Sequence, residues 1–194
     1  MRETHGVSTT RDDESTAATR RDRNVPEFVY HYSEDGTITR FAPHVPQTNP
    51  SHPPAVWAMD AEHSPLSWFP RDCPRISVWA NNDEQRAILR EVFNTESDRI
   101  CACESHWVHG MQRARVYRYT FAGSQFAPWA MADGQYISSE AVYPQSVDVL
   151  DDLIALHAEA DVELRFTPRL GVLMDRMLAS GLPFSFVRIR DARR

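Results

Sequence analysis

Short strand-like and helix-like segments follow one another along this chain without a regular rhythm, and this order constrains the fold more than any other feature. Runs rich in β-branched and aromatic residues, bounded by Gly, Pro, Asn and Asp, indicate roughly eight short strands. A doubly wound parallel sheet would need strands and helices to alternate steadily, and they do not. The pattern therefore predicts an α+β fold with mixed, mostly antiparallel sheets and flanking helices.

The boundaries of these segments follow from turn residues and from hydrophobic periodicity. We expect strands or extended segments over 28–33, 37–41, 55–59, 76–80, 99–103, 115–121, 135–137, 141–143, 162–166 and 184–190. We expect helices over 60–68, 83–93, 104–112, 149–160 and 168–180, the last one ending at Gly181 as a left-handed cap. The proline-rich stretch 43–54 predicts an extended loop.

The first 24 residues differ in composition from the rest of the chain. Their arginines balance their acidic residues, and Met1 and Val7 are their only sizeable apolar side chains. Such a segment cannot bury enough apolar surface to offset the entropy lost on ordering, so we expect a disordered tail over 1–24. Residues 25–194 have the length and composition of a single α+β domain.

The charged residues exclude several classes of function. The formal net charge of −6 argues against a general nucleic-acid binder, which usually presents a basic face. All 21 basic residues counted as Lys or Arg are arginines. Schiff-base enzymes and P-loop nucleotide hydrolases need a lysine, so both classes are excluded. An anion site in this chain must use arginine, backbone N–H groups or a helix N-terminus.

The distribution of apolar residues and cysteines indicates the compartment. The beginning of the chain lacks the apolar core of a signal peptide, and no apolar run approaches the ~20 residues of a membrane helix. The three cysteines are an odd number, which does not suit a disulfide framework. We therefore expect a cytoplasmic protein with reduced thiols that does not contact a membrane.

Several short strings of residues are distributed along most of the chain. They include Val29-Tyr30-His31-Tyr32-Ser33, Val56-Trp57-Ala58, Phe69-Pro70-Arg71-Asp72-Cys73-Pro74-Arg75, Tyr117-Arg118-Tyr119 and Tyr136-Ile137-Ser138. Together they resemble a small bacterial family whose function is not known, over most of residues 28–190. This resemblance implies no activity.

The order of the expected elements is also similar to that of the ADP-ribosyltransferase fold. Members with a His–aromatic–Glu constellation carry the histidine on an early strand, the aromatic residue on the next strand and the glutamate beside a late strand. His31, Trp57 and Glu140 occupy these places here. The resemblance implies NAD or a related nucleotide as substrate, with His31 bound to a ribose hydroxyl and Glu140 stabilising the cation that develops as nicotinamide leaves. A structural histidine and an exposed strand-edge glutamate are the simpler alternatives.

Arg71 and Arg75 are the best candidates for binding an anion. They flank Asp72-Cys73-Pro74, and two guanidinium groups four residues apart could hold a pyrophosphate or a carboxylate. Alternatively, Arg71 pairs with Asp72 on the surface.

Tyr32 and Ser33 follow His31 on the same expected strand and are candidates for binding the substrate. Alternation along a strand places Tyr32 on the face opposite His31. Trp57 and Tyr119 are candidates for stacking on a nicotinamide or a nucleobase. The alternative for both aromatic residues is the core, because large aromatic side chains supply much buried area.

Cys101, Cys103, His106 and His109 are all of a metal-ligand type and lie close together in the sequence. Zinc takes four such ligands, but the single residue between the two cysteines departs from the usual spacing of two to four. On a strand, Cys101 and Cys103 would share one face and could equally be small core residues. We therefore expect no metal, and we keep a zinc site at these four residues as an alternative.

Three functional hypotheses follow. The first is an ADP-ribosyltransferase-like enzyme that cleaves the N-glycosidic bond of NAD or a related nucleotide. The second is a small-molecule-binding or biosynthetic protein that uses the same His, Arg and aromatic pocket on a different substrate. The third is a zinc-stabilised interaction domain. Each of the first two has a small-molecule or nucleotide partner, and the sequence does not define an oligomeric state.

Overall fold

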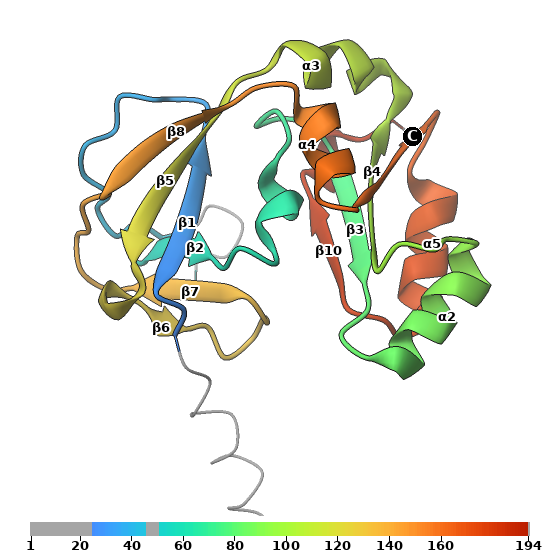
Figure 1. Ribbon diagram of the computed structural model, residues 1–194, viewed down its shortest axis with the longest axis horizontal. Coiled ribbons are helices and arrows are strands. Elements are labelled where there is room, and N and C mark those ends of the chain that lie inside the picture. Colours follow the sequence, from blue (N-terminus) through green and yellow to red (C-terminus); the bar gives the residue numbers. More distant parts are fainter. Residues whose placement is uncertain (1–24, 46–50, 194) are drawn as a thin grey trace, which may run out of the picture.

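A computed structural model of the protein describes residues 25–45 and 51–193. These residues form two β-sheets that lie side by side, with helices around the second sheet (Figure 1). The α+β class with mostly antiparallel sheets is therefore confirmed. The tail expected over 1–24 and part of the proline-rich loop lie outside the described residues.

The first sheet has six strands, and all of its neighbouring strands run antiparallel. Alternate residues of its central strands point to one side, where Val29, Tyr119 and Phe121 are fully buried around Phe41. In spatial order its strands are β6 (Ala127–Pro128), β7 (Gln135–Ser138), β2 (Val56–Met59), β1 (Phe28–Ser33), β5 (Val116–Ala122) and β8 (Ser146–Leu150).

The second sheet has four strands and combines antiparallel pairs with one parallel pair, β4 with β9. In spatial order its strands are β10 (Phe184–Val187), β3 (Arg75–Trp79), β4 (Arg99–Glu104) and β9 (Glu163–Thr167). The helices are α2 (Asp83–Phe93), α3 (Val108–Arg113), α4 (Leu153–Glu159) and α5 (Gly171–Ser180).

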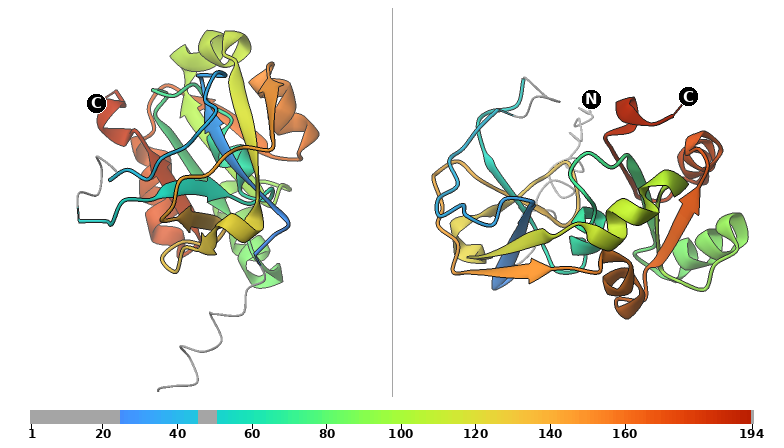
Figure 2. Two further views of the ribbon diagram at one scale, coloured as in Figure 1. Left: turned by 90° about the vertical axis from the view of Figure 1, so that its left-hand side faces the viewer. Right: turned by 90° about the horizontal axis from the view of Figure 1, so that it is seen from above.

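The two faces of the second sheet are covered by different helices. Ile100 and Ala102 of β4 pack with residues of α2 and α5, which lie on the outer side of the molecule (Figures 1 and 2). Cys101 and Cys103 point to the other face, where they pack with Met111 of α3. This alternation is what a strand between two apolar layers requires.

The cluster around Cys101 and Cys103 joins the two sheets. It contains Leu66 and Phe69 from the connection between β2 and β3, and also Val116 at the start of β5. Short 3₁₀ turns complete the connections: η1 (Ser64–Ser67), η2 (Ser105–Trp107), η3 (Gly123–Gln125) and η4 (Ile189–Asp191).

Helix α2 has the predicted boundaries, but several other segments differ. The expected helix over 60–68 is only the turn η1, and the one over 104–112 is η2 followed by α3. The expected strand over 141–143 contributes one bridge, from Val142 to Phe41. The last strand ends at Val187, before η4.

The helix predicted over 149–160 was wrong in its first part. Residues 146–150 form strand β8, and α4 begins only at Leu153. Asp152 is the N-cap of α4, with its side chain accepting a hydrogen bond from the Ala155 N–H (3.2 Å). Asp148 pairs with Arg118 across the β5–β8 ladder (3.1 Å).

Gly171, the first residue of α5, and Gly181, its C-cap, are expected to respond oppositely to replacement by alanine. Gly181 has a φ of +71°, where a Cβ is strained, so Gly181→Ala should lower the free energy of unfolding by about 1 kcal/mol. A Cβ on Gly171 would meet nothing within 4 Å, so Gly171→Ala should raise it by about 0.5–1 kcal/mol. Urea denaturation of both variants measures the difference, and equal effects would contradict the assigned helix end.

Candidate functional site

A pocket of about 230 Å³ lies at the junction of the two sheets. The end of β1 and the start of β5 contribute from the first sheet, and the start of β3 and the end of β10 contribute from the second. We call it the inter-sheet pocket. Its lining residues are Tyr32, Ser33, Glu34, Ser67, Phe69, Arg71, Arg75, Val116, Val187 and Arg188.

Arg75 is the most unusual residue of this pocket. Its Nε donates to the carbonyl of Leu66 (2.9 Å), and its Nη1 donates to the carbonyl of Cys73 (3.3 Å). The guanidinium lies over the ring of Phe69, at 5.3 Å from the ring centroid. No carboxylate of residues 25–45 or 51–193 forms an ion pair with it. Burial lowers the pKa of Arg75 to about 10, because a low-dielectric environment disfavours the charged form.

Two further arginines line the rim of the pocket, and each is close to an acidic residue. The backbone N–H of Arg71 donates to Glu34 Oε1 (2.9 Å), which fixes the Arg71 backbone beside the end of β1. Arg188 pairs with Asp72 (3.6 Å) and has a φ of +56°, a backbone conformation that non-glycine residues rarely adopt. Strained residues of this kind gather at functional sites more often than elsewhere.

Tyr32 and Ser33 bring polar groups of β1 to the same pocket. Burial raises the pKa of the Tyr32 phenol, so the hydroxyl stays protonated and can donate a hydrogen bond. The Ser33 hydroxyl accepts from the Asp35 N–H (3.1 Å). The residues that line the pocket therefore include hydroxyl-bearing side chains, one glutamate and three arginines.

His31 lies on the opposite face of β1 and does not line the inter-sheet pocket. Its Nδ1 is 2.8 Å from the carbonyl oxygen of Trp57, and its ring packs edge-on against Phe41 with centroids 4.9 Å apart. A carbonyl can only accept, so Nδ1 carries the proton. Burial lowers the pKa of His31, which keeps the ring neutral and leaves Nε2 as an acceptor.

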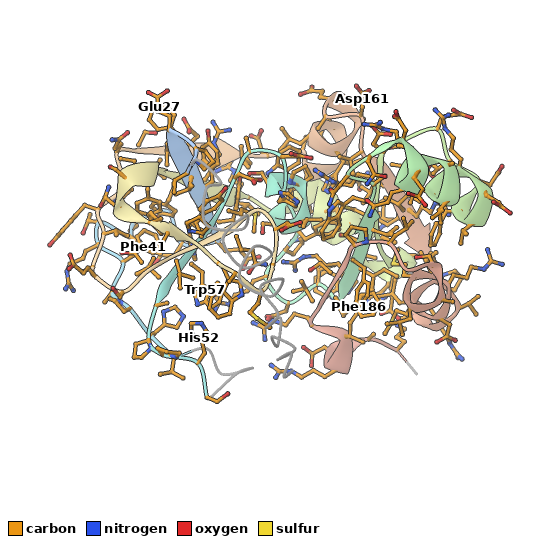
Figure 3. The ribbon with its side chains drawn as sticks, turned by 90° about the horizontal axis from the view of Figure 1, so that it is seen from below. Glu27, Phe41, His52, Trp57, Asp161 and Phe186 are labelled. Atoms are coloured by element: carbon orange, nitrogen blue, oxygen red, sulfur yellow. The ribbon has the colours of Figure 1, made fainter. Side chains whose placement is uncertain are left out.

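Strands β1 and β2 pair at one register position only, Tyr30 with Met59. Beyond it, the His31–Trp57 hydrogen bond spans the gap between the strands. Trp57 packs with His52 and Trp129, at centroid distances of 4.9 and 5.3 Å, and Figure 3 shows Trp57 beside His52. An aromatic cluster thus adjoins the place where the sheet opens.

Glu140 lies in the turn after β7, where its side chain is exposed. Its backbone N–H donates to the Ser138 hydroxyl (3.3 Å). Within the part of the chain that the structure describes, its carboxylate makes no ion pair with His31 or with an arginine. Neither Glu140 nor Trp57 lines the inter-sheet pocket.

Tyr119 is part of the core and not of a binding surface. The side chain is fully buried, and its hydroxyl donates to the Asp35 carbonyl (2.6 Å) and accepts from the Ile38 N–H (3.1 Å). It therefore holds the loop after β1 against the first sheet. Burial raises its pKa in the same way as that of other enclosed phenols.

The four residues of the zinc alternative do not converge. Cys101 and Cys103 are fully buried in the cluster that joins the sheets, whereas His106 and His109 are exposed. Among the described residues, no group of three His, Cys, Asp or Glu side chains could hold a metal ion. Burial raises the pKa of Cys101 to about 11, which suits a neutral core thiol.

The structure therefore brings together Tyr32, Ser33, Arg71 and Arg75 of the predicted site. Sequence reasoning missed Arg188, Glu34 and Ser67. Arg188 comes from the end of β10, and nothing in its neighbourhood in the sequence marks it.

Two sheets with a basic pocket at their junction define an α+β protein with a candidate site for a small anion. The chain belongs to the family of unknown function DUF6886, whose model matches residues 30–192. The chain matches no curated protein and no solved structure. Within 25–45 and 51–193, no helix combines the length and apolarity that crossing a membrane requires.

Proposed function

We propose that this protein binds a small molecule carrying a phosphate or carboxylate group in the inter-sheet pocket. The observation that carries the proposal is Arg75, whose half-buried guanidinium bonds to two carbonyls and to no carboxylate of the described residues. A cation that is partly desolvated and has no counter-charge is unfavourable, and the anionic group of a ligand would supply that charge. Arg71 and Arg188 would draw the anion towards the rim.

The other lining groups narrow the class of ligand. A volume of about 230 Å³ is below the roughly 300–1,000 Å³ that drug-sized ligands occupy, so the ligand is small. Glu34 accepts hydrogen bonds, and Ser33 and Ser67 both donate and accept them. A phosphorylated polyol or a hydroxy acid carries the anionic group and the hydroxyl groups that this lining would bind.

Arg188→Ala is expected to weaken the binding of such a ligand by about tenfold or more, the usual effect of removing one charged hydrogen-bond donor. Calorimetric titration with glycerol phosphate, lactate and inorganic phosphate measures this. Arg190→Ala is the matched control, because Arg190 is exposed and pairs with the neighbouring Asp191. Binding that is unchanged in Arg188→Ala, or weakened equally in Arg190→Ala, would contradict the proposal.

A second candidate function is cleavage of the N-glycosidic bond of NAD or a related nucleotide. The observation that favours it is the neutral His31, which lies where β1 and β2 pair at one register position only and keeps Nε2 as an acceptor for a ribose hydroxyl. In this reading Glu140 stabilises the developing cation and Trp57 stacks on the base, and the arginines of the inter-sheet pocket, on the other face of β1, take no part.

Nicotinamide release, followed by chromatography with mass detection, tests this second candidate. Release by the wild type that is lost in both His31→Ala and Glu140→Gln would support it. Absence of release from folded wild-type protein would rule it out for NAD and leave the binding proposal to its own titration.

A further inference from the structure

A second hollow, separate from the inter-sheet pocket, lies where the edge strand β9 meets the beginning of α5. Its volume is about 250 Å³. We call it the α5 hollow. It is lined by Arg165, Thr167, Arg169, Val172, Leu173 and Arg176.

The lining contains three arginines and no acidic residue. Arg165 is already engaged, because its Nε donates to Glu163 Oε1 and its Nη2 donates to the Phe93 carbonyl, both at 2.7 Å. Arg169 and Arg176 are exposed, and no ion pair involves either of them in the part of the chain that the structure describes. Because the negative charge of Glu163 offsets the positive charge of Arg165, the residues of the hollow keep a net positive charge of about two units.

Two of the residues that line the α5 hollow are apolar. Val172, in the first turn of α5, is 72% exposed, and Leu173 beside it packs in the core. An exposed branched side chain in a lining that also holds arginines favours a ligand that is anionic at one end and apolar at the other. The N-cap of α5, Leu170, offers no side-chain acceptor to the first N–H groups of the helix, so these donors have no side-chain cap.

We propose that the α5 hollow binds a phosphate monoester attached to an apolar or aromatic group. A phosphate monoester carries a charge close to −2 at neutral pH, which balances Arg169 and Arg176, whereas a carboxylate balances only one of them. Guanidinium groups also bind phosphate oxygens in pairs. The apolar part of the ligand lies against Val172.

Titration of the ¹⁵N-labelled full chain with phenyl phosphate tests this proposal. The amide signals of residues 171–173 should shift, and Arg169→Ala and Arg176→Ala should each weaken the binding about tenfold or more. Arg90→Ala is the matched control, since Arg90 is an exposed arginine of α2 that pairs with Glu96. Arg75→Met should leave the shifts at 171–173 unchanged, which separates this site from the inter-sheet pocket.

Two results would overturn the proposal. The first is a titration in which residues 171–173 do not shift, or shift equally in wild type and in Arg169→Ala. The second is benzoate binding as tightly as phenyl phosphate, because a monoanion would then suffice. Neither result bears on the inter-sheet pocket, because the residues whose signals decide it, 171–173, do not line that pocket.

Discussion

Arg75→Met is expected to remove most of the stabilisation that a ligand of the inter-sheet pocket gives, while the protein stays folded. Methionine follows the aliphatic part of the arginine side chain and removes only the charged end. The carbonyls of Leu66 and Cys73 lose their donor, but a desolvated charge also disappears. Removing one partner of a buried charge pair weakens binding by about 2–5 kcal/mol, or at least about 30-fold in Kd.

Thermal unfolding measures this loss. At a ligand concentration 100-fold above the wild-type Kd, the wild type should gain about 2.7 kcal/mol, whereas a variant that binds 30-fold more weakly gains about 0.9 kcal/mol. The wild-type midpoint should then rise by about 5–10 °C, and that of Arg75→Met by about 2–3 °C. Arg86→Met is the control, because Arg86 pairs with Asp83 and Asp98 on the surface. A full rise in Arg75→Met would show that the anion binds elsewhere.

Elements whose signals are local could be predicted from the sequence. Helix α2 has the predicted boundaries because its apolar periodicity and its ends are both encoded within a few residues. Asn82 accepts from the Gln85 N–H (2.9 Å) at its beginning, and Asn94 adopts a left-handed conformation at its end. Likewise, Gly181 ends α5 as expected.

Strand β8 shows where local reasoning fails. Acidic residues before an apolar run are typical of a helix N-terminus, and they favoured a helix from 149 onwards. The alternation of Val147 and Val149 with Asp148 has strand periodicity, but it extends over too few residues to decide. The pairing with β5, which lies about 30 positions earlier in the chain, decides the conformation, and no local signal encodes that pairing.

The candidate site was predictable only where its residues are neighbours in the sequence. Arg71 and Arg75 belong to one short connection, so their convergence followed from spacing. Arg188 reaches the same pocket only because β10 pairs with β3, with Val187 opposite Arg75. One sequence does not reveal this pairing. Tyr119, for which the core was the alternative, is held there by partners in a distant loop, Asp35 and Ile38, which no local pattern indicates.

Acidification from pH 6.5 to pH 5 is expected to destabilise the protein through His157 and His31. Burial lowers the pKa of both imidazoles below the value of 6.5 that they have in the unfolded chain. His157 is fully buried, with its Nδ1 2.6 Å from the Leu153 carbonyl and its ring 4.9 Å from that of Phe69. A proton on it would place a second cation near Arg75, which itself contributes to the lowered pKa.

The direction of the stability change and the pH range in which it occurs follow from proton linkage. Well above pH 6.5, both histidines are neutral in the folded and the unfolded chain, so the free energy of unfolding carries no penalty from them. As the pH falls below 6.5, the unfolded chain takes up protons that the folded protein does not, and stability falls. The free energy of unfolding then falls by up to about 1.4 kcal/mol per pH unit for each histidine, or by about 2.7 kcal/mol per pH unit for both. This slope persists until the pH reaches the pKa values that the histidines have in the folded protein. Glu163, whose pKa is also lowered, contributes only below about pH 4.5.

Urea denaturation of His31→Asn/His157→Asn at several pH values tests this assignment. The asparagine amide can replace Nδ1 as the donor to the carbonyls of Trp57 and Leu153, and it does not titrate. The double variant should therefore lose most of the slope between pH 6.5 and pH 5, even though the smaller side chains lower its stability at every pH. His109→Asn should keep the slope, because His109 is exposed. A slope that persists in the double variant would show that other groups take up the protons, and that the buried imidazoles do not limit the stability of the fold in acid.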